Sequence, residues 1–212
     1  MKTLMLSAPN FELIETLTRK VCLMTVQQIA SAFWSSDISR RHCRRRLTDL
    51  NKSGWLKLAT VLAHPLLEAD RPLFKWAPGD DGPDSEEVSD ESRSRWCNPA
   101  IPTSVVVATE KAANLMGSTA CGLPRPEQWN HDLHLSQVFV MYRRRRSKLA
   151  RIWVGEHSLP KAGYRIKDPD AFLVDRHGTI HRVVESAGKY NSKQVESFHN
   201  HCVNHDLPYE LW

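Results

Sequence analysis

The sequence predicts an α+β protein made of two units joined by an acidic connection. Residues 1–77 contain apolar positions at helical spacing and an arginine-rich helix. Residues 101–212 alternate short β-type runs with amphipathic helices, and residues 78–100 between them are rich in Asp, Glu, Ser, Gly and Pro. We therefore expect a mainly helical first unit, a linker, and a mixed second unit with a sheet.

The overall composition is that of a globular protein with an excess of basic residues. The chain has 212 residues, of which 41% are hydrophobic and 25% are charged, and its net charge of +5 suits an anionic partner. Its arginines cluster at residues 40–46 and 143–146. Two basic clusters favour nucleic acid as the partner, and a solvated or acid-paired helix face is the alternative for each.

The cysteines and the N-terminus favour a cytoplasmic protein. Five cysteines are widely spaced without a Cys-x-x-Cys pair, which predicts neither a disulfide framework nor a structural zinc site and favours a reducing compartment. The apolar part of residues 1–6 is too short for a secretory signal. No apolar run approaches the roughly 20 residues of a membrane span, so we expect no membrane association.

The first unit is expected to begin with three helices. Apolar residues at helical spacing predict them over residues 11–17, 25–33 and 37–52. Thr25 precedes the second helix as its N-cap, and Gln28 three residues later completes a capping box. A short helix followed by a longer one is the order found in helix-turn-helix units.

The third of these helices has two different faces. Cys43, Leu47 and Leu50 form one apolar stripe. Arg41 and Arg45 lie on the opposite side, and Arg40 and Arg44 flank the stripe. An apolar back and an arginine-rich front, packed behind a shorter helix, are the layout of a helix that reads the major groove. The residues expected to contact DNA are Arg40, Arg41, His42, Arg44, Arg45 and Lys57.

Two strands are expected to follow the third helix. Gly54 ends the helix as a C-cap, and residues 55–61 and 72–76 predict an outgoing and a returning strand of a wing. This first third of the chain resembles winged helix-turn-helix domains. The resemblance implies binding of double-stranded DNA, and a winged helix that binds another protein is the alternative.

Residues 78–100 are predicted to be a flexible linker. The segment between Asp80 and Glu91 holds seven acidic residues, and hydrophobic residues are few. Such a composition cannot bury enough apolar surface to offset the entropy of ordering. We expect a solvated tether, with an acidic mask over the basic helix as the alternative.

The second unit is expected to contain a short helix at residues 109–116 and then a helix, three strands, a helix and a strand, an αβββαβ order. The expected bounds of these six elements are residues 131–142, 151–156, 169–175, 180–185, 191–205 and 208–212.

Two carboxylates lie on the otherwise apolar hairpin of this unit. If Asp175 and Gly178 pair across a two-residue turn, Asp170 falls opposite Val183. Glu185 is then the diagonal neighbour of Asp170 on the same face, with roughly 7–8 Å between their backbones.

A carboxylate pair of this kind can converge on one Mg²⁺, which prefers oxygen ligands. The metal would activate water, and Lys189 would orient the nucleophile or neutralise charge. The predicted catalytic residues are Asp170, Glu185 and Lys189, of which Asp170 and Glu185 would bind the metal. Mg²⁺ is the expected cofactor if the site is active, and no cofactor is expected if it is inactive.

The element order, with Pro169-Asp170 on one strand and Glu185 on the next, resembles the PD-(D/E)xK nuclease fold. That pattern places a lysine two residues after the acid, where this chain has Ala187, and Lys189 is displaced. The resemblance implies either a degenerate nuclease-like domain or an active Mg²⁺-dependent DNA endonuclease.

Most of the chain also resembles the replication-relaxation family of plasmid and mobile-element proteins. The shared features are the N-terminal winged helix, the helix start His131-Asp132-Leu133, and the Pro169-Asp170-Ala171 strand before Glu185. The resemblance implies a DNA-binding accessory or regulatory protein of plasmid replication or mobilisation. A homodimer and a replication or mobilisation protein are further expected partners, and a protein-interaction adaptor is the remaining alternative.

Overall fold

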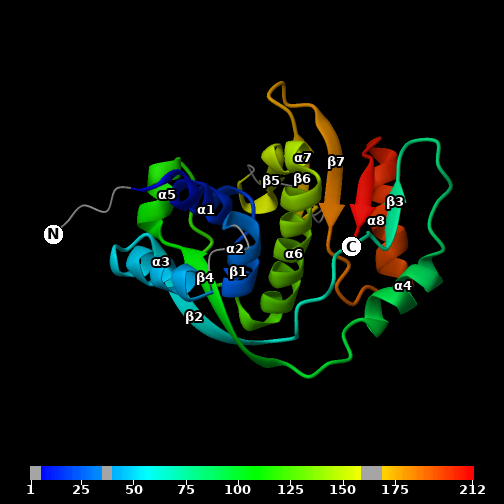
Figure 1. Cartoon of the computed structure of the whole chain (residues 1–212). Helices are drawn as coiled ribbons and strands as arrows, with labels where there is room; N and C mark the ends of the chain where they lie inside the picture. Colours follow the sequence, from blue (N-terminus) through cyan, green and yellow to red (C-terminus); the bar gives the residue numbers. More distant parts are fainter. Residues whose placement is uncertain (1–5, 35–39, 159–168) are drawn as a thin grey trace.

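The computed structural model describes residues 6–34, 40–158 and 169–212, which form a mixed helix and sheet structure. Two sheets lie on either side of a long central helix, α6 (Trp129–Arg145), as Figure 1 shows. None of the described helices combines the length and the apolar character that a membrane crossing requires.

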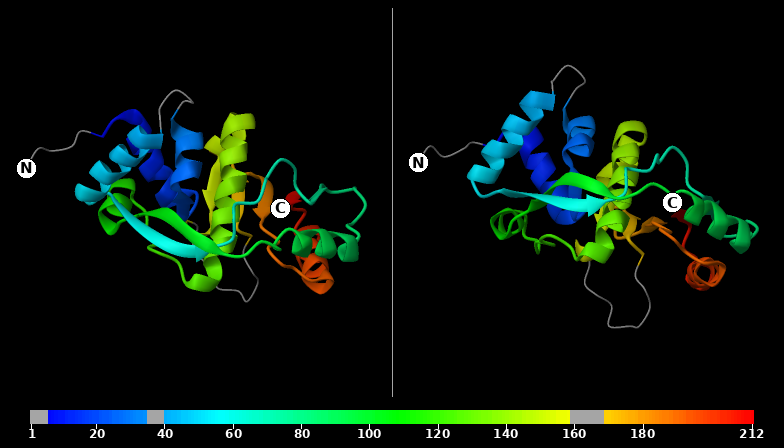
Figure 2. Two further views of the ribbon diagram at one scale, coloured as in Figure 1. Left: turned by 60° about the horizontal axis from the view of Figure 1, so that its bottom comes forward. Right: turned by 90° about the horizontal axis from the view of Figure 1, so that it is seen from below.

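The first sheet has three antiparallel strands in the spatial order β1-β4-β2. The strands are β1 (Leu23–Thr25), β2 (Leu56–Ala63) and β4 (Ile101–Ala108). The helices of this unit are α1 (Ala8–Arg19), α2 (Val26–Phe33), α3 (Arg40–Lys52) and α5 (Glu110–Met116). Figure 2 shows β2 and β4 side by side as a long ribbon along one flank of these helices.

Local sequence signals in the first unit are confirmed. The Thr25 hydroxyl accepts a hydrogen bond from the Gln28 N–H (3.1 Å), and the Gln28 side chain accepts one from the Thr25 N–H (2.8 Å). Gly54 follows α3 with a φ of +74°, which a glycine adopts without strain. Gln28 Nε2 also donates to the Leu133 carbonyl (2.9 Å), so the capping residue ties α2 to α6.

The second sheet has the strand order β3-β8-β7-β6-β5, with β7 and β8 parallel and the other pairs antiparallel. Its strands are β3 (Phe74–Trp76), β5 (Trp153–Gly155), β6 (Ala171–Val174), β7 (Ile180–Glu185) and β8 (Tyr209–Leu211). The shorter helices and 3₁₀ turns are α4 (Ser85–Ser94), α7 (Ser147–Arg151), η1 (Pro126–Gln128) and η2 (Glu156–Ser158).

Helices cover both faces of this sheet. Val184 belongs to the core on the α6 side, while Val183 packs with Phe198 of α8 (Ser192–Asn204) on the other side. The expected order of helix, three strands, helix and strand is therefore present, with α7 and η2 as additions.

The pairing of the wing strands differs from the prediction. We expected residues 72–76 to return beside residues 55–61, but β3 pairs with β8 in the second sheet. The partner of β2 is β4, whose sequence position had assigned it to the second unit. Residues 105–107 of β4 are three buried valines, which supply the apolar centre that the first sheet needs between β1 and β2. Residues 64–100 are thus an excursion between two paired strands.

The acidic segment 78–100 contains ordered structure in place of the expected flexible linker. It forms α4, which packs against α8 through the buried Val88. Figure 1 shows α4 beside α8 at the far end of the second sheet.

The anchors of α4 are mostly polar and small, so the composition did not reveal them. Ser89 donates its hydroxyl to the Tyr190 carbonyl (3.0 Å), and Ser92 donates to the Gly188 carbonyl (2.6 Å). The indole N–H of Trp96 donates to the same Gly188 oxygen (2.7 Å). Buried hydroxyls with partners hold this helix where a large apolar face is missing.

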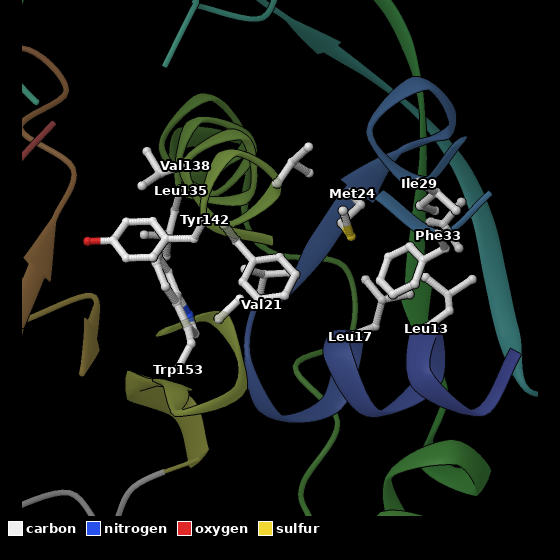
Figure 3. Close-up of a cluster of buried hydrophobic side chains, with 14 of the residues drawn as sticks. Leu13, Leu17, Val21, Met24, Ile29, Phe33, Leu135, Val138, Tyr142 and Trp153 are labelled. Atoms are coloured by element: carbon white, nitrogen blue, oxygen red, sulfur yellow. The ribbon is translucent and has the colours of Figure 1, made fainter. Parts of the chain in front are cut away.

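One hydrophobic core extends across both units. Figure 3 shows that its labelled side chains come from α1, α2 and their connection on one side and from α6 and β5 on the other, namely Leu13, Leu17, Val21, Met24, Ile29, Phe33, Leu135, Val138, Tyr142 and Trp153. Ser136 on α6 also donates to the Leu23 carbonyl (2.5 Å). Because α6 is buried against both sheets, the two units are packed together through it.

We expected no disulfide framework, and among the described residues the structure joins one pair of cysteines. Cys22 and Cys121 form a disulfide with a Cα–Cα distance of 5.5 Å, although 99 residues separate them. The loop after α5 reaches the end of α1, where Ser118 donates to the Thr18 carbonyl (2.7 Å). Spacing along the chain cannot reveal this pair because packing of α5 on α1 creates it.

Candidate functional site

The outer face of α3 carries exposed arginines. The predicted apolar stripe of Cys43, Leu47 and Leu50 is confirmed, since all three are fully buried. Positions three and four residues apart share a face of a helix. On the opposite face such positions hold the exposed Arg41 and Arg45, and the exposed Arg44 lies at the edge of this face, beside the buried stripe. None of these three guanidinium groups forms an ion pair with a residue in the described part of the chain.

The other residues predicted to contact DNA surround this face. Lys57 is exposed near the start of β2, and His42 is exposed on α3. Arg40 begins α3, but its side chain lies outside the described part. Arg46 was not among the residues predicted to contact DNA. Its guanidinium lies 6.0 Å from the centre of the Trp34 ring, in a cation–π contact.

The second arginine cluster, residues 143–146, is largely acid-paired. Three of its members form ion pairs, namely Arg143 with Glu12 (2.5 Å), Arg145 with Asp70 (2.7 Å) and Arg146 with Glu210 (2.9 Å). This cluster is therefore better described as an acid-paired helix face, the alternative considered above, than as a DNA contact.

The structure places Asp170 directly opposite Glu185. Asp170 immediately precedes β6 and Glu185 ends β7. Because Ala171 pairs with Val184, continuing the register by one residue brings the two acids face to face. The diagonal arrangement that we predicted is thus corrected to a direct one.

The predicted register was wrong by two residues for two local reasons. Asp175 pairs with Thr179, so the turn has one residue more than expected, and a bulge between Leu173 and Val174 adds another. Strand side chains alternate between faces, so an even shift leaves both carboxylates on one face. The two carboxylates are therefore neighbours on one face, as predicted, but they lie directly opposite each other and not on a diagonal.

Protein donors hold both carboxylates, which are almost completely buried at 4% exposed for Asp170 and 0% for Glu185. Asp170 Oδ2 accepts from the Ser186 N–H (2.7 Å) and lies 2.9 Å from Nε2 of His131. Glu185 Oε2 accepts from the Asp170 N–H (3.1 Å), and Glu185 Oε1 accepts from the Tyr190 hydroxyl.

His131 on α6 lies between two acids. Its Nδ1 is 3.1 Å from Asp132 Oδ1, and its Nε2 faces Asp170. Burial alone lowers the pKa of His131, but the carboxylates of Asp170 and Asp132 outweigh burial and hold this pKa well above 6.5. His131 is therefore an imidazolium at neutral pH, and its positive charge lies against Asp170.

His134, one turn further along α6, has the opposite charge state. Burial, followed by the charges of Arg95 and His131, lowers the pKa of His134 to about 3. Its Nδ1 lies 2.9 Å from the Ser186 hydroxyl, and the edge of its ring meets Trp96. This neutral histidine helps to fix the strand end that holds Asp170.

The residues around Asp170 do not fit a hydrated Mg²⁺. Three carboxylate oxygens of Asp170 and Glu185 are engaged with protein groups, and no third described side chain joins them at metal-ligand spacing. The His131 imidazolium supplies positive charge beside the acid. Lys189 is exposed and forms no ion pair with a described residue, and Ala187 is buried at the position of the family lysine.

A cavity of about 410 Å³ opens beside this cluster. Its lining includes His131, Ser186 and Lys189, together with His64 and Trp96 from the excursion. The His-Asp-Leu motif was a sequence signal for His131, but no signal pointed to His64 or Trp96. The folding back of residues 64–100 brings them there.

Substitution of His131 by glutamine should remove a stabilising contribution that depends on pH. Because the pKa of folded His131 is raised, its contribution is complete below about pH 6.5, the pKa of an unperturbed histidine, and is lost as pH rises through the folded pKa. Urea unfolding of both proteins, repeated between about pH 5.5 and about pH 9 in steps of about one pH unit, measures the difference between their free energies of unfolding. A stability difference that grows with pH would contradict the assigned imidazolium.

No protein-family model matches this chain, and no curated protein or solved structure is significantly similar to it. The functional argument therefore depends on two features of the chain itself. They are the arginine face of α3, formed by Arg41, Arg44 and Arg45, and the carboxylate–histidine cluster of Asp170, Glu185 and His131.

Proposed function

We propose that this protein binds double-stranded DNA as an accessory or regulatory factor. The observation that carries the proposal is the arginine face of α3. Three exposed guanidinium groups, which have no acidic partner among the residues that the structure describes, form a positive surface that phosphates can neutralise. In contrast, three of the four arginines at residues 143–146 form ion pairs with acidic residues of the same chain.

The topology of the first unit supports a winged helix-turn-helix. Its elements follow the order helix, strand, helix, helix, strand, strand, and the last strand lies between the other two. In this arrangement α3 follows α2 and is the helix that enters the major groove. Lys57 at the start of β2 follows the end of α3 closely in sequence, so we expect it to contact the DNA phosphate backbone beside that helix.

The second unit is proposed to be a nuclease-like domain that has lost its metal site. The αβββαβ order and the parallel β7 and β8 support the likeness. The imidazolium of His131 beside Asp170, with Ala187 at the lysine position, supports the loss. The suggested setting, replication or mobilisation of a plasmid or mobile element, depends on the family resemblance alone.

One pair of measurements tests this proposal. Binding of a fluorescent DNA duplex is followed by anisotropy from about 50 mM to about 200 mM salt, and supercoiled plasmid is incubated with protein and Mn²⁺. Phosphate contacts from four residues, namely Arg41, Arg44, Arg45 and Lys57, predict a slope of about −3.6 when the logarithm of the binding constant is plotted against the logarithm of the salt concentration. Each contact contributes about −0.9 to this slope. The plasmid is expected to remain supercoiled.

Three outcomes would contradict the proposal. Absence of duplex binding at low salt would leave a protein-interaction adaptor as the better function. Nicking that Asp170→Asn abolishes would show an active endonuclease that depends on Asp170. Nicking that survives this substitution would show a nuclease centre elsewhere in the chain.

A further inference from the structure

Three potential metal ligands from distant segments meet where the two units join. Cys22 lies between α1 and β1, Cys121 follows α5, and His157 lies in η2 after β5. Their ligand atoms are all within 4.8 Å of one another. Among the described residues, this is the group of His, Cys, Asp and Glu side chains with the spacing of a metal site.

We propose that Cys22, Cys121 and His157 bind a thiophilic divalent cation, with Zn²⁺ as the expected ion, when the two cysteines are reduced. Each thiol releases its proton to solvent and each sulfur donates an electron pair to the metal. The disulfide and the metal complex are alternative states of the same two sulfur atoms, because only thiolates bind zinc.

The histidine already has the spacing of a zinc ligand. His157 Nδ1 lies 3.6 Å from Cys22 Sγ. In a tetrahedral site with Zn–S of about 2.3 Å and Zn–N of about 2.0 Å, the sulfur and nitrogen lie about 3.5 Å apart. The two thiolates would lie about 3.8 Å apart in the same geometry, so reduction and a small side-chain rotation suffice.

The backbone beside His157 leaves space for its ring in this position. Gly155 makes room for the ring, since a Cβ there would lie 2.7 Å from His157 Cε1 and 2.6 Å from the Lys20 carbonyl oxygen. A larger residue at 155 would displace the imidazole from Cys22.

Water is expected to complete the coordination. A cavity of about 670 Å³ borders His157, one of the three ligands, together with Ser158 and Trp153. Three protein ligands plus water are an established zinc arrangement. Cys22 and Cys121 lie beside elements of the first sheet and His157 follows β5 of the second sheet, so the metal would join the two sheets.

Cobalt titration of the reduced full-length protein tests the site, using protein without a histidine tag. We expect one Co²⁺ per chain, with thiolate-to-cobalt charge-transfer absorption and visible bands typical of tetrahedral cobalt, and Zn²⁺ should displace it. Oxidised protein should give no such spectrum. Cys22→Ser should remove the charge-transfer absorption, and His157→Gln should weaken binding about 10-fold or more.

The matched control is Cys97→Ser, which removes an exposed free cysteine elsewhere in the chain. Its cobalt spectrum should equal that of the unmodified sequence, and circular dichroism checks that each variant is folded. No tetrahedral cobalt spectrum from the reduced protein, or an unchanged spectrum in folded Cys22→Ser, would overturn the metal site. These results are independent of DNA binding.

Discussion

Glu210→Ala is expected to lower the free energy of unfolding by about 3 kcal/mol, the lower end of the cost of breaking a buried ion pair. Glu210 on β8 is fully buried and accepts hydrogen bonds from Tyr142 (2.6 Å), Arg146 (2.9 Å) and Arg182 (2.5 Å). The substitution leaves two guanidinium groups and a buried hydroxyl without their acceptor. The side chain of Arg146 is 37% exposed and can turn to solvent, which limits the loss.

Urea unfolding followed by circular dichroism measures this effect against two controls. Glu210→Gln keeps the volume and one acceptor, so its loss should be smaller than that of the alanine variant. Glu12→Ala removes a partner of Arg143 that is 46% exposed, and it should cost less than about 1 kcal/mol. Equal losses for Glu210→Ala and Glu12→Ala would show that burial does not determine the strength of these pairs.

The double variant Arg41→Ala/Arg45→Ala is expected to bind duplex DNA about 10- to 100-fold more weakly. Both guanidinium groups lie on the exposed face of α3, and removing two phosphate contacts should reduce the salt slope by about 1.8. Exposed positions contribute little to stability, so unfolding should change by less than about 0.5 kcal/mol. Anisotropy titrations at several salt concentrations give both the affinity and the slope.

A charge-matched control separates a specific surface from net charge. Arg93→Ala/Arg144→Ala also removes two positive charges from exposed side chains, on α4 and α6. Its affinity should change by less than about 3-fold, because these residues lie outside the proposed interface. Equal weakening by both double variants, or no weakening by Arg41→Ala/Arg45→Ala, would exclude α3 as the contact surface.

Local interactions explain which features the sequence could predict. The capping box of Thr25 and Gln28, the buried stripe of α3 and the turn at Gly54 each involve residues only a few positions apart. The proximity of Asp170 and Glu185 was also predictable, because one hairpin joins them. Its register was less so, since the bulge is a small local irregularity without a sequence signature.

Contacts between distant segments explain what the sequence could not predict. The sequence by itself determined the α+β class, the order of helices and strands from α6 to β8, the faces of α3 and the acidic hairpin, because helical and strand periodicity record which side is buried. Only the tertiary structure decided that β4 joins β2, that His131 lies against Asp170, and that Cys22, Cys121 and His157 meet. These contacts depend on how distant segments pack in the shared core. The hydrophobic pattern shows that a segment is buried, but it does not show which distant segment lies beside it.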